Sequence, residues 1–247
     1  MARLARRLLA LLAVLSLVAQ AGTVLAGPWP REEGAVFISV SSEQDRSDNR
    51  YDSLYAEYGL SPRNTLGLEL GHTEGESNAL LWWQRALDDG SGPNRWTVSM
   101  GIGAIQRDGR THPMGELGGS WGRAFDTLPV LKLVPGGGWL ALETRFKMAA
   151  ITQEIDFGPN VIADETTYLT PESTSKAEAT IGWHVSDRLM LINQFRFEDR
   201  QDDGLSSKLA VSAVQDLIGP AKVELGLIEP LSGPGERAVK LGAWFGF

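Results

Sequence analysis

The segment RAVKLGAWFGF, residues 237–247, ends the chain with apolar residues alternating one by one with polar or small ones. Successive side chains of an extended strand point to opposite faces. A period of two therefore predicts a β-strand with one apolar face. The apolar face comprises Val239, Leu241, Ala243, Phe245 and Phe247, and the opposite face comprises Ala238, Lys240, Gly242, Trp244 and Gly246.

The same alternation recurs along most of the chain, interrupted by clusters of Gly, Pro, Asn, Asp and Ser that are typical of turns. We interpret the pattern as twelve strands. The segments 78–87 and 113–125 are patterned weakly, so ten or fourteen strands remain alternatives. The expected strands are 35–43, 51–60, 64–72, 78–87, 95–106, 113–125, 138–150, 173–184, 188–198, 204–214, 221–228 and 237–247.

The connections between these strands differ between the two ends of the expected meander. Connections at one end are longer and mostly acidic, and those at the other end are mostly shorter, with 126–137 the exception. Short turns on the periplasmic side and longer loops outside are typical of outer-membrane barrels. The longer set is 43–50, 72–78, 106–112, 151–172, 198–204 and 229–236, and the other set is 61–64, 88–94, 126–137, 185–188 and 215–220.

Residues 1–26 have the three parts of a secretory signal peptide. Three arginines lie within residues 3–7, an apolar stretch follows from residue 8 to about 19, and Val24-Leu25-Ala26 is a small-residue cleavage motif. We expect cleavage near Ala26, which leaves 27–247 as one barrel domain. An uncleaved anchor is the alternative, although the apolar stretch is short compared with the roughly 20 residues of a spanning helix.

The composition excludes several classes of function. The chain has no cysteine and three histidines, and its formal net charge is -8. The absence of cysteine excludes a disulfide scaffold, a thiolate metal site and a cysteine nucleophile. The acidic balance argues against nucleic acid as a partner, because binding to phosphates requires clustered Lys and Arg. No Walker A motif or dinucleotide fingerprint is present, so we expect no cofactor and no metal.

The signal peptide, the meander and the terminal Trp244-Phe245-Gly246-Phe247 resemble those of Gram-negative outer-membrane β-barrel proteins. The resemblance implies an all-β fold: an antiparallel up-and-down transmembrane β-barrel of about twelve strands in the bacterial outer membrane. It also implies contact with outer-membrane lipid and recognition of Phe245 and Phe247 by the barrel-assembly machinery. A soluble periplasmic sandwich or lipocalin-like barrel would show the same alternation with its apolar face inside, and it is the alternative.

The polar face carries the residues that we expect to line the lumen. The first half of the barrel supplies acids, and the second half supplies mainly bases. If these walls stay apart, they form a narrow pore for small polar or anionic solutes. If they meet, their charges pair and produce a non-conducting structural or interaction barrel. The residues are Glu57, Glu69, Glu116, Glu143, Arg145, Lys147, Lys176, Glu178, Arg196, Lys208, Lys222, Glu224 and Lys240.

A third hypothesis is a lipid-acyl hydrolase. His184-Val185-Ser186 followed by Glu198 resembles the pattern of outer-membrane lipid A deacylases. There the serine would be the nucleophile, the histidine its base and the glutamate the orienting group. The predicted turn at 185–188 argues against it, because Glu198 would lie at the far end of the next strand, roughly 30 Å away at about 3.3 Å per residue.

Overall fold

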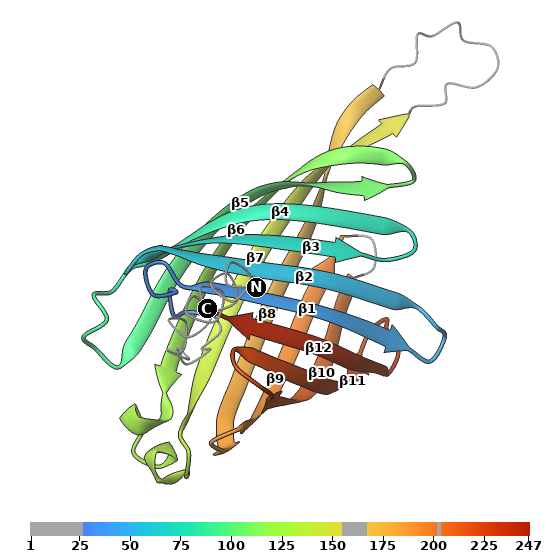
Figure 1. The fold of residues 1–247 in the computed structure, drawn as a ribbon. Coiled ribbons are helices and arrows are strands. Elements are labelled where there is room, and N and C mark those ends of the chain that lie inside the picture. The colour runs from blue at the N-terminus through green and yellow to red at the C-terminus, as the bar shows by residue number, and fades with distance from the viewer. Residues whose placement is uncertain (1–26, 155–166, 202–203) are drawn as a thin grey trace, which may run out of the picture.

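The computed structural model describes residues 27–154, 167–201 and 204–247, of which 152–154 and 167–170 are described as backbone only. The expected signal peptide lies outside this range. Twelve antiparallel strands form one closed barrel (Figure 1). The strands are β1 (Val36–Asp45), β2 (Arg50–Ser61), β3 (Asn64–His72), β4 (Glu76–Ala86), β5 (Asn94–Arg107), β6 (Arg110–Ala124), β7 (Gly138–Glu154), β8 (Thr167–Ser186), β9 (Leu189–Arg200), β10 (Gly204–Asp216), β11 (Ala221–Ser232) and β12 (Ala238–Gly246).

Each strand pairs with its neighbours in the chain, and β1 pairs with β12 to close the sheet. The closure continues beyond the last strand residue. Val36 N donates to Phe247 O at 2.9 Å, and Phe247 N donates to Val36 O at 2.8 Å. Closure leaves the sheet without an edge strand, which is the property that a sheet needs in hydrocarbon. The predicted up-and-down barrel of about twelve strands is confirmed.

We call the end of the barrel at which β1 joins β2 and β3 joins β4 the loop end. The connections at this end are shorter than predicted. The expected loop 106–112 is a two-residue turn between Arg107 and Arg110. Its residues Asp108 and Gly109 have φ angles of 52° and 75°. Positive φ at both positions suits a type I′ hairpin turn, whose twist matches that of the strands. The ladder therefore continues where we expected irregular chain.

The strands β7 and β8 are the longest, with 17 and 20 residues, whereas β3 has nine. They extend well past the predicted ends at 150 and 173, and their hairpin projects beyond the rest of the loop end (Figure 1). The opposite end, called here the terminal end, holds the start of β1 and the end of β12. There the predicted long connection contains two short 3₁₀ helices, η1 (Phe125–Thr127) and η2 (Leu131–Leu133).

The outer surface of the barrel is apolar along most strands. Ile102 on β5 is 75% exposed, and Leu117 on β6 and Leu241 on β12 are also more than half exposed. An apolar surface of this extent is unusual for a protein in water. A soluble sandwich or lipocalin-like barrel would bury these side chains, so the structure contradicts that alternative. Among the described residues, no helix is long and apolar enough to span a membrane.

Replacing Ile102 by Arg is expected to destabilise the folded barrel in lipid. The strand partners of Ile102 are Leu81 and Gly115, which places it within the apolar exterior. An arginine in the middle of the lipid-facing band costs about 2–4 kcal/mol, and one near the interface costs about 0–1 kcal/mol. Ile218→Arg, in the turn between β10 and β11 where Ile218 is 91% exposed, is the matched control. Urea unfolding in vesicles measures both, and equal losses would contradict a lipid-facing exterior.

Candidate functional site

The lumen contains a charged cavity of about 570 Å³, which we call the vestibule. Its lining reaches Glu76 and Arg200, so it extends to the loop end. Glu43, Tyr51 and Glu198 also line it, and the prediction of lumen residues had omitted them. The residues of the predicted lumen set that line the vestibule are Glu69, Glu143, Arg145, Lys147, Lys176, Glu178, Arg196, Lys208 and Lys240.

Ion pairs cross the lumen between strands that are not neighbours. Arg145 Nη1 on β7 lies 3.1 Å from Glu69 Oε2 on β3, and Lys147 Nζ lies 3.2 Å from Glu69 Oε1. Arg196 Nη1 on β9 lies 3.3 Å from Glu43 Oε1 on β1. In each case the strands are four places apart in the closed order. The acidic and basic walls therefore meet in part.

The remaining predicted lumen charges are also mostly paired. Glu57 pairs with Arg31, and Lys222 Nζ lies 2.7 Å from Asp216 Oδ1. Two residues of the predicted lumen set, the base Lys208 and the acid Glu143, form no ion pair with any residue in the described ranges. The other pairs are Glu116 with Lys147, Lys176 with Glu198, Glu178 with Arg196, and Glu224 with Lys240.

Residues 27–31 lie inside the barrel near its terminal end, and we call them the N-terminal plug. Pro28 is fully buried. Gln84 Nε2 donates to Gly27 O at 3.0 Å, and Arg31 N donates to Thr65 Oγ1 at 2.9 Å. The Arg31 guanidinium pairs with Glu57 and lies 4.5 Å above the Phe37 ring centroid. No periodic pattern marks this short Pro-rich segment, so the sequence analysis did not detect it.

An apolar cluster, which we call the apolar floor, lies across the lumen at the terminal end. It joins β1 to β7, which are half-way around the barrel from each other. Trp29 of the plug and Tyr55 pack against it. The apolar floor shows that the lumen is not polar throughout its length, contrary to our expectation. Trp139, for example, is 1% exposed and faces inward, where it cannot contact the membrane interface. Its members are Phe37, Trp139, Ala141, Met190, Ile192, Val214 and Trp244.

The hydrolase residues are not brought together. Ser186 stands at the turn, opposite Leu189, and its Oγ accepts a hydrogen bond from Arg188 N at 3.4 Å. Glu198 lies at the other end of β9, opposite Lys176, with which it pairs. His184 contacts the Trp139 ring at a centroid distance of 6.1 Å. A nucleophile, its base and an orienting carboxylate need hydrogen-bond contact, which this arrangement lacks.

Within residues 27–154, 167–201 and 204–247, no group of three or more His, Asp or Glu side chains is arranged to hold a metal ion.

Comparison with solved structures shows the fold of small outer-membrane channels. NanC porin superimposes with a TM-score of 0.57 and 11% identity over 84% of this chain and 98% of its own. The COG4313 outer-membrane channel from Pseudomonas putida F1 gives 0.57 and 13% over 91% and 100%. KdgM porin gives 0.53 and 9% over 85% and 99%. No family model matches the chain, and no curated protein matches it in sequence. At these identities the likeness is one of fold.

Proposed function

We propose that this protein is a narrow outer-membrane channel for small polar or anionic solutes, exported by cleavage of its signal peptide near Ala26. The observation that carries the proposal is a charged vestibule of about 570 Å³ inside a closed barrel with an apolar exterior. The apolar exterior suits hydrocarbon, and the charged interior suits hydrated solutes. The fold shared with three outer-membrane channels supports the same function.

The loop end faces the cell exterior in this proposal, and the terminal end faces the periplasm. A chain exported by cleavage near Ala26 would begin at Gly27, the first residue of the N-terminal plug. The plug lies at the terminal end. Solutes then enter the vestibule first and meet the N-terminal plug and the apolar floor afterwards. Below the vestibule, the described residues enclose cavities of about 50 and 90 Å³. We infer that the periplasmic half restricts passage.

A negatively charged solute fits the vestibule through Lys208, whose ammonium forms no ion pair with any described residue. Lys208 lines the same cavity as Arg200 and Lys176 near the loop end. Lys176 Nζ lies 3.5 Å from Glu198 Oε2. A carboxylate on a solute would give Lys208 an ion-pair partner. KdgM porin has been solved in complex with oligogalacturonate, which supports an acidic solute for a barrel of this shape.

Planar-bilayer recording tests the proposal. Folded protein, verified by a shift in gel migration on heating, is expected to give small discrete conductance steps that decrease when a small anionic solute is added to the vestibule side. The cross-lumen pairs and the apolar floor favour a second candidate, the structural barrel with a blocked lumen. Absence of conductance from folded protein, both unmodified and with the plug removed, would contradict the channel and support that candidate.

Glu69→Gln is expected to increase the preference of the channel for anions. The change removes the acidic partner of both Arg145 and Lys147, whose charges then remain in the vestibule. The reversal potential in a KCl gradient measures the preference. Glu229→Gln is the matched control, because Glu229 pairs with Arg237 outside the vestibule. An unchanged reversal potential for Glu69→Gln would show that ions do not pass these side chains.

A further inference from the structure

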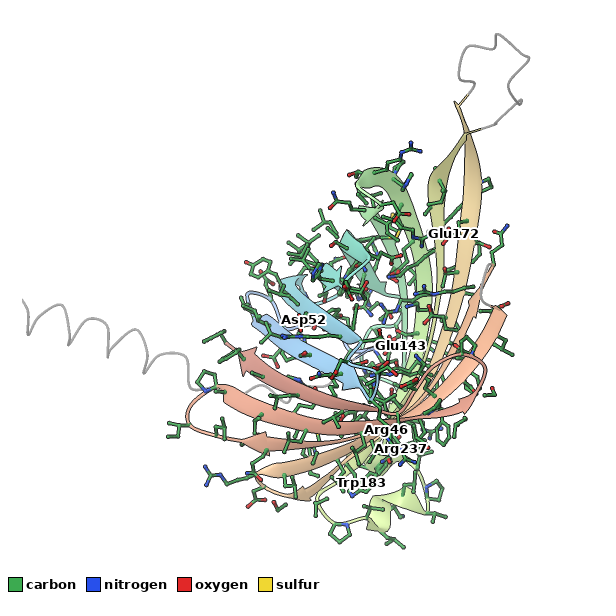
Figure 2. All side chains as sticks on the ribbon, turned by 90° about the vertical axis from the view of Figure 1, so that its right-hand side faces the viewer. Arg46, Asp52, Glu143, Glu172, Trp183 and Arg237 are labelled. Atoms are coloured by element: carbon green, nitrogen blue, oxygen red, sulfur yellow. The ribbon has the colours of Figure 1, made fainter. Side chains whose placement is uncertain are left out.

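We propose that the lumen contains a binding site for the chain's own N-terminal ammonium, formed by Glu143 with Glu116 beside it. The inference rests on the proposed cleavage near Ala26, which would make Gly27 the first residue of the mature chain. Figure 2 shows Glu143 in the interior of the barrel, among side chains from several strands. The site would anchor the N-terminal plug in the lumen.

Gly27 lies next to the Glu143 carboxylate. A Cβ atom added to Gly27 would collide with Glu143 Oε1 and lie 3.7 Å from the Ala141 Cβ. Gly27 also has a φ of 86°, a conformation that side-chain-bearing residues rarely adopt. The hydrogen bond from Gln84 Nε2 to Gly27 O fixes the same residue from the other side. Because N and Cβ of one residue are about 2.5 Å apart, the backbone nitrogen of Gly27 lies within about 5 Å of Glu143 Oε1.

Of the predicted lumen acids, Glu143 is the one for which the described residues supply no partner. Within the described part of the chain, its carboxylate forms no hydrogen bond or ion pair. The nearby cation Arg145 is held by Glu69, and the nearby acids Glu57 and Glu178 have their own partners in Arg31 and Arg196. Glu143 is half-buried, and a carboxylate that is partly removed from water without compensation is costly. One additional positive charge at Gly27 would balance it.

A second observation is independent of Glu143. A cavity of about 50 Å³ is lined by Gly27 and by four titratable side chains: Tyr55, Glu116, Glu143 and Arg145. Glu116 is 6% exposed, and its Oε2 accepts no hydrogen bond from any described residue, although Lys147 Nζ lies 3.3 Å away. Two carboxylates thus line a cavity next to Gly27. An ammonium carries three donors and no acceptor, which suits both of them.

Labelling of the α-amine tests the site without requiring ion flow. The mature chain, beginning at Gly27, is folded in detergent micelles and treated with an amine-reactive ester over a range of pH, and the N-terminal peptide is quantified by mass spectrometry. In the unmodified protein, labelling is expected to need a pH about one unit higher than in Glu143→Gln, a roughly tenfold difference in rate at fixed pH. Exposed Lys132, near the terminal end, serves as an internal standard.

Two further variants separate pairing from burial. Glu116→Gln should also accelerate labelling, and it replaces Glu143→Gln if that variant does not fold. Glu43→Gln removes a vestibule acid that pairs with Arg196 and should leave the N-terminal rate unchanged. The same slow rate in the unmodified protein, Glu143→Gln and Glu116→Gln would show protection by burial alone and overturn the site. Loss of conductance with an intact labelling difference would overturn the channel and leave the site standing.

Discussion

Removal of residues 27–31 is expected to raise the single-channel conductance several-fold. These residues fill the lumen at the terminal end, where Pro28 is buried and Trp29 packs against the apolar floor. Conduction through a barrel depends on its narrowest segment and on the groups that line it. Deleting the plug widens that segment and exposes Glu57, so cation preference should increase as well. Planar-bilayer recording with equal KCl on both sides measures the conductance, and the reversal potential in a KCl gradient measures the preference.

Single substitutions separate the effect of the plug from general damage. Trp29→Ala removes the contact of the plug with the apolar floor and should give an intermediate rise in conductance. Trp183→Ala is the control, because Trp183 faces the outside of the barrel. It follows inward-facing Gly182 on β8 and shares the face of exposed Ile181. Figure 2 shows it near the terminal end. If the deletion variant folds and its conductance equals that of the unmodified protein, the plug does not restrict the pore.

Phe247→Ala is expected to abolish most of the assembly of the protein into the outer membrane of living cells. The alternating C-terminal strand resembles the segment that the barrel-assembly machinery recognises, and we propose that Phe247 contributes to that recognition. Phe247 is about half exposed on the outside of the barrel, so its ring adds little to packing. The substitution keeps both backbone hydrogen bonds to Val36 that close the sheet. The folded state itself should therefore change little.

The measurement compares assembled protein in outer-membrane fractions with refolding of purified protein in detergent. Phe197→Ala on β9 is the matched control, because Phe197 is another outward-facing phenylalanine of similar exposure. Both variants should refold with a similar loss of stability. If both also reach the outer membrane in equal amounts, Phe247 is an ordinary lipid-facing residue and not part of an assembly signal.

The residue pattern was sufficient to predict the strands and which side chains share a face, and the resemblance to outer-membrane barrels indicated which face points outward. Val239 and Leu241 point outward and Lys240 points inward, as their alternation requires, because the pleat of a strand leaves each side chain only two directions. The expected strand 64–72 has the same bounds as β3. The turns were less predictable. Asp108-Gly109 extends the ladder because both residues adopt positive φ, a choice that polar composition alone does not reveal.

The amino-acid sequence by itself determined about twelve antiparallel strands and which side chains share a face of each patterned strand, because period-two alternation is a local property of neighbouring residues. Only the tertiary structure decided which charges meet: Glu69 reaches Arg145 because closure places β3 across the lumen from β7. The tertiary structure also decided the packing of Trp139. This residue lies on the polar face of its strand, and the sequence did not indicate that side chains from opposite walls would pack around it. The plug at 27–31 also depends on closure, since a short segment without periodicity acquires its place only from the walls that surround it.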